Sequence, residues 1–138
     1  MQTAEKIERT ALRNLIHNED YTRKVLPFLK SEYFQDRSER VVFSEIQKFI
    51  SQYNKRPTKE TLQIDLNKRK DLNEDEYKKI VELISSLDPQ DVDLEWLVNT
   101  TEKFCKDRAV HNAVMEGIHI IDGKDKKHTP EAIPEILR

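Results

Sequence analysis

The chain has 138 residues, and its 24 basic and 26 acidic side chains leave a formal net charge of −2. This near balance argues against general affinity for nucleic acid, and no apolar run approaches the roughly 20 residues of a membrane span. A single cysteine excludes an internal disulfide and no secretion signal begins the sequence, so we expect a soluble intracellular protein of one domain.

The first quarter of the chain predicts two helices and a connector. Thr3 is placed to cap a helix over residues 3–17, and a second helix is expected over residues 19–29. Pro27 should kink this second helix or end it early, because proline lacks a backbone N–H group. Residues 31–34 then form a connector with two aromatic side chains.

The middle of the chain predicts three more helices, each with an apolar face. The first covers residues 37–53. Thr58 caps the next, and Asn73 forms a capping box with Glu76 for the third, which ends near Leu87. The side chains expected to face inward are Val42, Phe43, Ile46, Phe49, Ile50 and Tyr53, then Leu62 and Leu66, then Tyr77, Ile80, Val81, Ile84 and Leu87. One core is expected to contain Phe43, Ile46, Phe49, Ile50, Ile80, Ile84, Leu97 and Phe104.

A long helix is predicted from near Val92 to a C-cap at Gly123, with acidic Asp93 and Glu95 in its first turn. At about 100° per residue, the apolar side chains of its two halves lie on opposite sides. One small core cannot cover both stripes of a helix about 45 Å long. The first stripe contains Leu94, Leu97, Val98, Thr101, Phe104 and Cys105. The second stripe, our candidate subunit interface, contains Val110, Ala113, Val114, Gly117, Ile118 and Ile121.

These patterns divide the chain into a helical head, residues 1–90, and an extended part, residues 91–138. After the long helix come a charged loop and a new helix start at Thr129 and Pro130. The second stripe can be covered by this C-terminal helix, by another subunit, or by both. Because only a few residues follow the new start, we expect the chain to be a piece of a longer protein.

Residues capable of catalysis are present, but none falls into a recognised pattern. The acidic runs at residues 19–20 and 74–76 suit the first turns of helices, where carboxylates interact with the helix dipole. One cysteine cannot complete a zinc site. The histidines, which lack the spacing of metal ligands, are His17, His111, His119 and His128. We therefore expect neither an enzyme nor a metal site in this chain.

Two other features have structural explanations. The segment from Gly117 to Asp125 resembles a phosphate-binding loop, but five residues instead of four separate its glycines, and Asp125 replaces the hydroxyl that would hold magnesium. The basic clusters at residues 68–70 and 124–127 are expected to be solvated helix ends. Trp96 is expected to anchor the edge of the core rather than stack on a base.

Several short segments follow one another in a characteristic order. They are residues 31–34, 56–58, 95–98, 101–103, 108–109, 112–113 and 132–136, with Leu62 and Leu66 between the second and third. From about Ala11 to Arg138, this succession resembles the N-terminal domain of the DnaB-family replicative DNA helicases, nearest to those of T-even-type bacteriophages.

The resemblance implies an all-α fold: a compact helical head followed by a long helix that forms the first arm of a helical hairpin, with the second arm truncated. Such hairpins pair between subunits and build a collar on a hexameric ring. The chain would then be a non-catalytic domain for subunit assembly and primase docking in DNA replication, in the cytoplasm of an infected bacterial cell. A helicase loader is a further candidate partner, and no tight nucleic-acid binding by this domain is implied.

ATP and magnesium would belong to a motor domain beyond Arg138, so no cofactor is expected in this chain. Two alternatives remain open. The chain can be a free-standing helical adaptor or inhibitor, or the helicase-binding C-terminal domain of a primase, which has a similar helical fold. The sequence that follows Arg138 in the gene would separate them.

Overall fold

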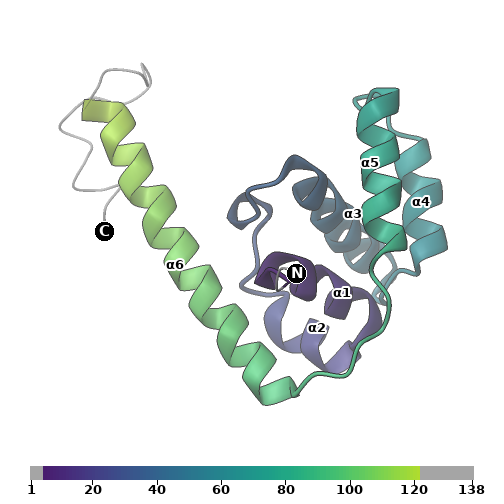
Figure 1. The fold of residues 1–138 in the computed structure, drawn as a ribbon, viewed down its shortest axis with the longest axis horizontal. Coiled ribbons are helices and arrows are strands. Elements are labelled where there is room, and N and C mark those ends of the chain that lie inside the picture. The colour runs from purple at the N-terminus through teal and green to yellow at the C-terminus, as the bar shows by residue number, and fades with distance from the viewer. Residues whose placement is uncertain (1–4, 122–138) are drawn as a thin grey trace, which may run out of the picture. The chain divides into compact units, whose positions relative to one another are not determined.

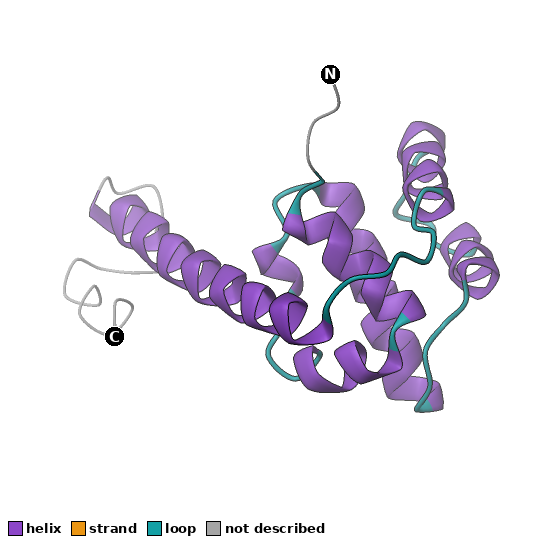
Figure 2. Ribbon diagram, turned by 60° about the horizontal axis from the view of Figure 1, so that its bottom comes forward, coloured by secondary structure: helices purple, strands orange, loops and turns teal. Residues whose placement is uncertain are grey.

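The computed structural model describes residues 5–121, with side chains as far as His119. In this part the backbone forms six α-helices and one 3-10 helix, joined by loops and without a β-strand (Figure 1 and Figure 2). The predicted all-α fold is therefore confirmed. The elements are α1 (Ile7–His17), α2 (Glu19–Val25), η1 (Ser31–Tyr33), α3 (Arg37–Tyr53), α4 (Lys59–Asn67), α5 (Glu74–Ser85) and α6 (Leu94–Ile121).

The chain divides into two compact units, Met1–Glu102 and Lys103–Arg138, which we call the N-terminal and C-terminal units. The border lies inside α6, so the first turns of this helix belong to the N-terminal unit. The division predicted from the sequence lies between residues 90 and 91, before this helix begins.

Polar side chains fix the starts of several helices, as the sequence predicted. Thr58 accepts the backbone N–H of Thr61, and Asn73 accepts that of Glu76 at 2.8 Å. The Glu76 carboxylate binds the Asn73 N–H in return, which confirms the capping box predicted for α5. Asp93 precedes α6 instead of lying in its first turn, and its carboxylate accepts the N–H of Trp96 at 3.0 Å.

The helices predicted over residues 3–17 and 19–29 are both shorter than these ranges in the structure. The first helix begins at Ile7, later than predicted, after Lys6 in an extended conformation, and the Glu5 carboxylate before it pairs with Arg13 at 2.8 Å. α2 ends at Val25, whose carbonyl accepts the N–H groups of two residues beyond Pro27, so the early end expected from this proline is confirmed. The predicted Thr3 cap, the Gly123 C-cap and the second hairpin arm from Thr129 lie outside the described residues.

α3 is the central helix of the N-terminal unit. It packs against α1, α4, α5 and η1, while α1 also packs against α2 and α4 against α5 (Figure 1). Phe43 of α3 is fully buried and stacks on Phe34, with 5.1 Å between the ring centroids. Other fully buried side chains include Leu12, Leu15, Tyr21, Ile46, Leu62, Leu66, Ile80, Ile84, Leu87 and Leu97.

The sequence predicts more buried residues at the C-terminal end of α3 than the structure contains. Phe49 and Ile50 are only half-buried, and Tyr53 is 52% exposed, with its ring 4.7 Å from that of Phe49. Phe104 is also half-buried and belongs to the C-terminal unit. Helical periodicity indicates which side of a helix faces a core, but not how far along the helix its neighbours continue to cover it.

The first turns of α6 complete the N-terminal unit. Leu97 and Thr101 are fully buried there. The Thr101 hydroxyl donates to the Leu97 carbonyl at 2.8 Å and lies 2.8 Å from the Tyr21 hydroxyl, which therefore donates to it. This buried hydrogen bond joins α6 to α2 across 80 positions of sequence.

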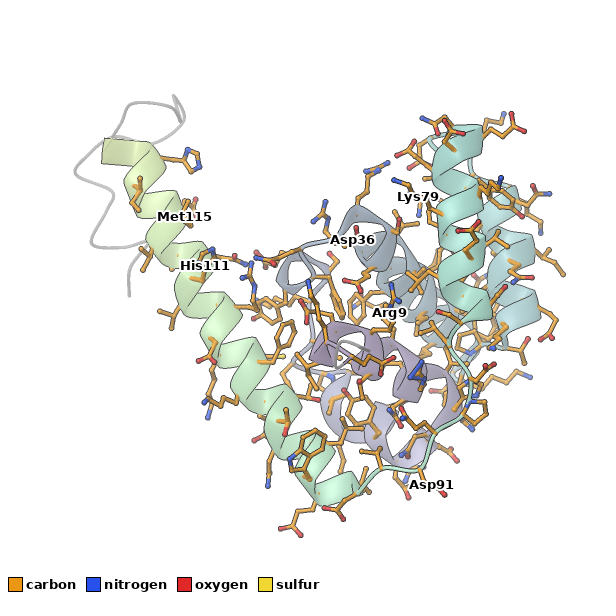
Figure 3. All side chains as sticks on the ribbon, viewed as in Figure 1. Arg9, Asp36, Lys79, Asp91, His111 and Met115 are labelled. Atoms are coloured by element: carbon orange, nitrogen blue, oxygen red, sulfur yellow. The ribbon has the colours of Figure 1, made fainter. Side chains whose placement is uncertain are left out.

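Two glutamates of α3 are buried, although the sequence pattern does not indicate this. Glu45 is 5% exposed and pairs with Arg69 at 3.3 Å. Glu39 is 7% exposed, and burial raises the pKa of its carboxyl, as does the negative charge of Asp36. Glu8 acts in the same direction, whereas the positive charges of Arg9 and Lys6 lower this pKa. Figure 3 shows Arg9 and Asp36, which line one polar cavity of this unit.

Replacing Glu39 with Gln (E39Q) is expected to stabilise the chain at pH 7 and to have much less effect at about pH 4. Because the pKa of Glu39 is higher in the folded state, its contribution to stability is present below the unfolded pKa and is lost as pH rises through the folded pKa. Urea unfolding midpoints of both proteins at the two pH values measure this. The control variant E45Q removes the buried negative charge that pairs with Arg69, so it should lower the stability of the chain at pH 7. If both variants raised the urea midpoint at pH 7, the assignment of a raised pKa to Glu39 in particular would be contradicted.

Candidate subunit interface

The second half of α6 exposes large apolar side chains. Val110 is 64% exposed, Val114 47% and Ile118 43%. These residues follow one another at intervals of four and therefore share one side of the helix. All three belong to the second stripe predicted from the sequence, and all three lie in the C-terminal unit.

Two small residues of the second stripe lie between these side chains. Ala113 is half-buried and Gly117 is buried. They are also four residues apart, so a neighbouring helix would meet little side-chain bulk at this point. Ile121, the remaining member of the second stripe, is the last residue of α6, and its side chain lies outside the described residues.

The exposed apolar surface is wider than the second stripe. Met115 is 41% exposed and lies about 100° around the helix from Val114. Figure 3 shows Met115 and His111 projecting from α6. Exposed apolar side chains that follow one another on one helix are typical of an interaction surface, whereas single ones are common on any protein.

The first stripe behaves differently. Leu97 and Thr101 are fully buried, and Cys105 is 6% exposed. Leu94, Val98 and Phe104 are half-buried. The apolar residues in the first half of α6 therefore lie on one side of the helix and are mostly buried, whereas those in the second half lie on the other side and are more exposed.

The acidic runs take the structural roles expected from the sequence. In the first turn of α2, Glu19 and Asp20 lie 3.3 and 4.0 Å from Arg23. In the first turn of α5, Glu76 caps the helix and accepts from Arg37 at 2.7 Å. These contacts leave the two runs as exposed helix starts.

The shifted pKa values of exposed carboxylates also have structural causes. A hydrogen bond from Arg69 lowers the pKa of Asp71 to about 2. Lys59, hydrogen-bonded at 2.6 Å, lowers the pKa of Asp88. A general acid or base works best with a pKa near the operating pH, so these carboxylates are poorly suited to proton transfer at neutral pH.

The candidate metal ligands and the phosphate-loop segment show no site among the described residues. No group of three potential ligands gathers anywhere in residues 5–121. His17 instead lies 2.7 Å from the Leu87 carbonyl through its Nε2 atom. Gly117 is inside α6, where the helical backbone offers no loop to surround a phosphate. The helices in the described part also lack any segment long and apolar enough to cross a membrane.

Two surface features differ from what the sequence predicts. Trp96 is 54% exposed, so it does not anchor the core edge as predicted. A cavity between α2 and the C-terminal end of α3 was missed, because its walls come from segments about 30 residues apart.

The basic cluster at residues 68–70 follows α4, and its Arg69 pairs with Glu45 and Asp71, in agreement with a helix end.

Together, these observations describe an all-α domain whose last helix has large exposed apolar side chains in its second half. Residues 1–98 match the family of DnaB-like helicase N terminal domains, and the chain belongs to this family. It is also 33% identical over 135 residues to the DnaB-like replicative helicase of Enterobacteria phage T4. The aligned region covers 92% of this chain and 28% of the phage protein.

Proposed function

We propose that this chain assembles the subunits of a hexameric replicative DNA helicase through the second stripe, and that it provides a docking surface for primase. Membership of the DnaB-like N-terminal family supports the helicase context. The observation that carries the assembly role is the exposure of Val110, Val114 and Ile118 on one side of a long helix.

The other parts of this proposal concern the longer protein. A motor domain following Arg138 would bind ATP and magnesium, and it would act in the cytoplasm of an infected bacterial cell. A helicase loader is a further candidate partner. A free-standing helical adaptor is the alternative, and a phosphate-binding loop encoded downstream of Arg138 would exclude it.

The chain alone is expected to associate weakly. Three side chains from each of two copies would contribute at most about 9–18 kcal/mol, since a fully buried Val or Ile contributes about 1.5–3 kcal/mol. Association costs about 4–15 kcal/mol, so we expect a Kd of about 10 μM to 1 mM. Sedimentation velocity over a concentration series measures this. A chain that stays monomeric at the highest concentration would contradict the assembly role.

A further inference from the structure

A preformed cavity of about 320 Å³ lies between α2 and the C-terminal end of α3, within the N-terminal unit. Its apolar lining comes from Leu26, Pro27 and Ile50. Lys55 and Arg56, from the turn that follows α3, lie at its edge. This volume is at the lower end of the range of ligand pockets, about 300–1,000 Å³, and suits one or two side chains.

Hydrogen bonds hold both walls of the cavity in place. After α2, the N–H groups of Phe28 and Leu29 each bind the Val25 carbonyl at 3.1 Å. On the other wall, Asn54 ends α3 in the left-handed conformation, with φ of 55°. Arg56 then donates from Nη1 to the Ile16 carbonyl at 2.8 Å. The turn that carries the two cations is therefore tied to α1.

The charges at the edge of the cavity are unevenly arranged. Arg23 is 3.3 Å from Glu19 at the α2 side, so these two charges offset one another. At the α3 side, Lys55 is exposed and pairs with no acidic group among the described residues. With Arg56 beside it, this side has an excess of positive charge next to an apolar wall.

We propose that this cavity docks a short acidic peptide segment of a partner protein. One Leu- or Phe-sized side chain of the segment would contact Leu26 and Ile50, and its carboxylates would face Lys55 and Arg56. Among the described residues, the lining has no aromatic side chain on which a base could stack, which favours a peptide over single-stranded nucleic acid. The binding of an acidic peptide is argued from the cavity itself, and only the suggestion that the peptide belongs to primase rests on the proposed function.

The test uses the whole chain and a fluorescein-labelled peptide, Asp-Glu-Asp-Leu-Phe-Asp. Fluorescence anisotropy should show micromolar to submillimolar binding that weakens as salt increases. Lys55→Glu should weaken binding about tenfold, whereas Lys48→Glu, an exposed lysine of α3 that does not line the cavity, should not. Replacing the Leu-Phe pair of the peptide with Ser-Ser should abolish binding, because the apolar lining of the cavity then has no side chain to contact.

Three outcomes would overturn the inference. They are absence of binding at millimolar peptide, equal effects of the two lysine variants, and an oligo-dT strand that binds more tightly than the peptide and is sensitive to Lys55→Glu. Purified primase separates this inference from the proposed function. If the peptide binds as described but primase does not, the docking role fails and the cavity assignment stands. If primase binds equally to wild type and Lys55→Glu, and the peptide does not bind, the cavity assignment fails alone.

Discussion

Replacing Ile118 with Asp (I118D) is expected to abolish self-association of the chain while leaving the N-terminal unit folded. Ile118 is 43% exposed and belongs to the C-terminal unit, so the carboxylate remains solvated in the monomer. In an assembled pair it would be buried without a partner, in both copies if the contact is symmetric. We expect Kd to rise at least about 100-fold, or about 2.8 kcal/mol.

Sedimentation equilibrium measures the association, and circular dichroism with thermal melting checks the fold. Ala109→Asp provides a matched control, because Ala109 is exposed and lies about 180° around α6 from Ile118. This control should associate like the wild type. If I118D unfolds the chain, the second stripe belongs to the chain's own core, and if Ala109→Asp is equally damaging, the contact does not use one side of α6.

Replacing Phe43 with Ala is expected to be among the most destabilising single changes in the N-terminal unit. Phe43 is fully buried and stacked on Phe34, so its truncation leaves a cavity beside the Phe34 ring. Such changes cost about 3–5 kcal/mol, against a total stability of about 5–15 kcal/mol for typical domains. The variant should unfold at a much lower urea concentration, or fail to fold at 37 °C.

Phe49→Ala on the same helix is the comparison, because Phe49 is only half-buried. We expect its cost to be about half as large, near 1.5–2.5 kcal/mol. Equal midpoints for the two variants would show that α3 does not pack its N-terminal half into the core as described.

Features determined by neighbouring residues were predicted well from the sequence. The bounds of α3 and the Asn73 capping box were correct, because a cap depends on a side chain and an N–H group three residues apart. Tyr53 and Trp96 were placed too deep, because their exposure depends on where other segments of the fold end. Buried Glu45 was missed because its partner, Arg69, is 24 residues away.

The difference between local and long-range features also applies to the two candidate surfaces. The second stripe was visible in the sequence, since its residues follow one helical period on a single element. The cavity beside Lys55 was not, because its lining combines residues of α2 with the end of α3, and these two segments share no sequence pattern. The proposed occupant of each surface is a separate molecule, so the periodicity of this sequence does not indicate which molecule binds there.

The hydrogen bond between Tyr21 and Thr101 also affects how the protein is made. The family match ends at residue 98, yet the buried hydroxyl that joins α6 to α2 belongs to residue 101. Because Thr101 follows α5 in the chain, it leaves the ribosome after α1 to α5, so the N-terminal unit cannot close completely until then. Closing a loop of this length has an entropic cost that only the final contacts offset. An expression fragment of the N-terminal unit should therefore extend past Thr101 and not stop where the family match does.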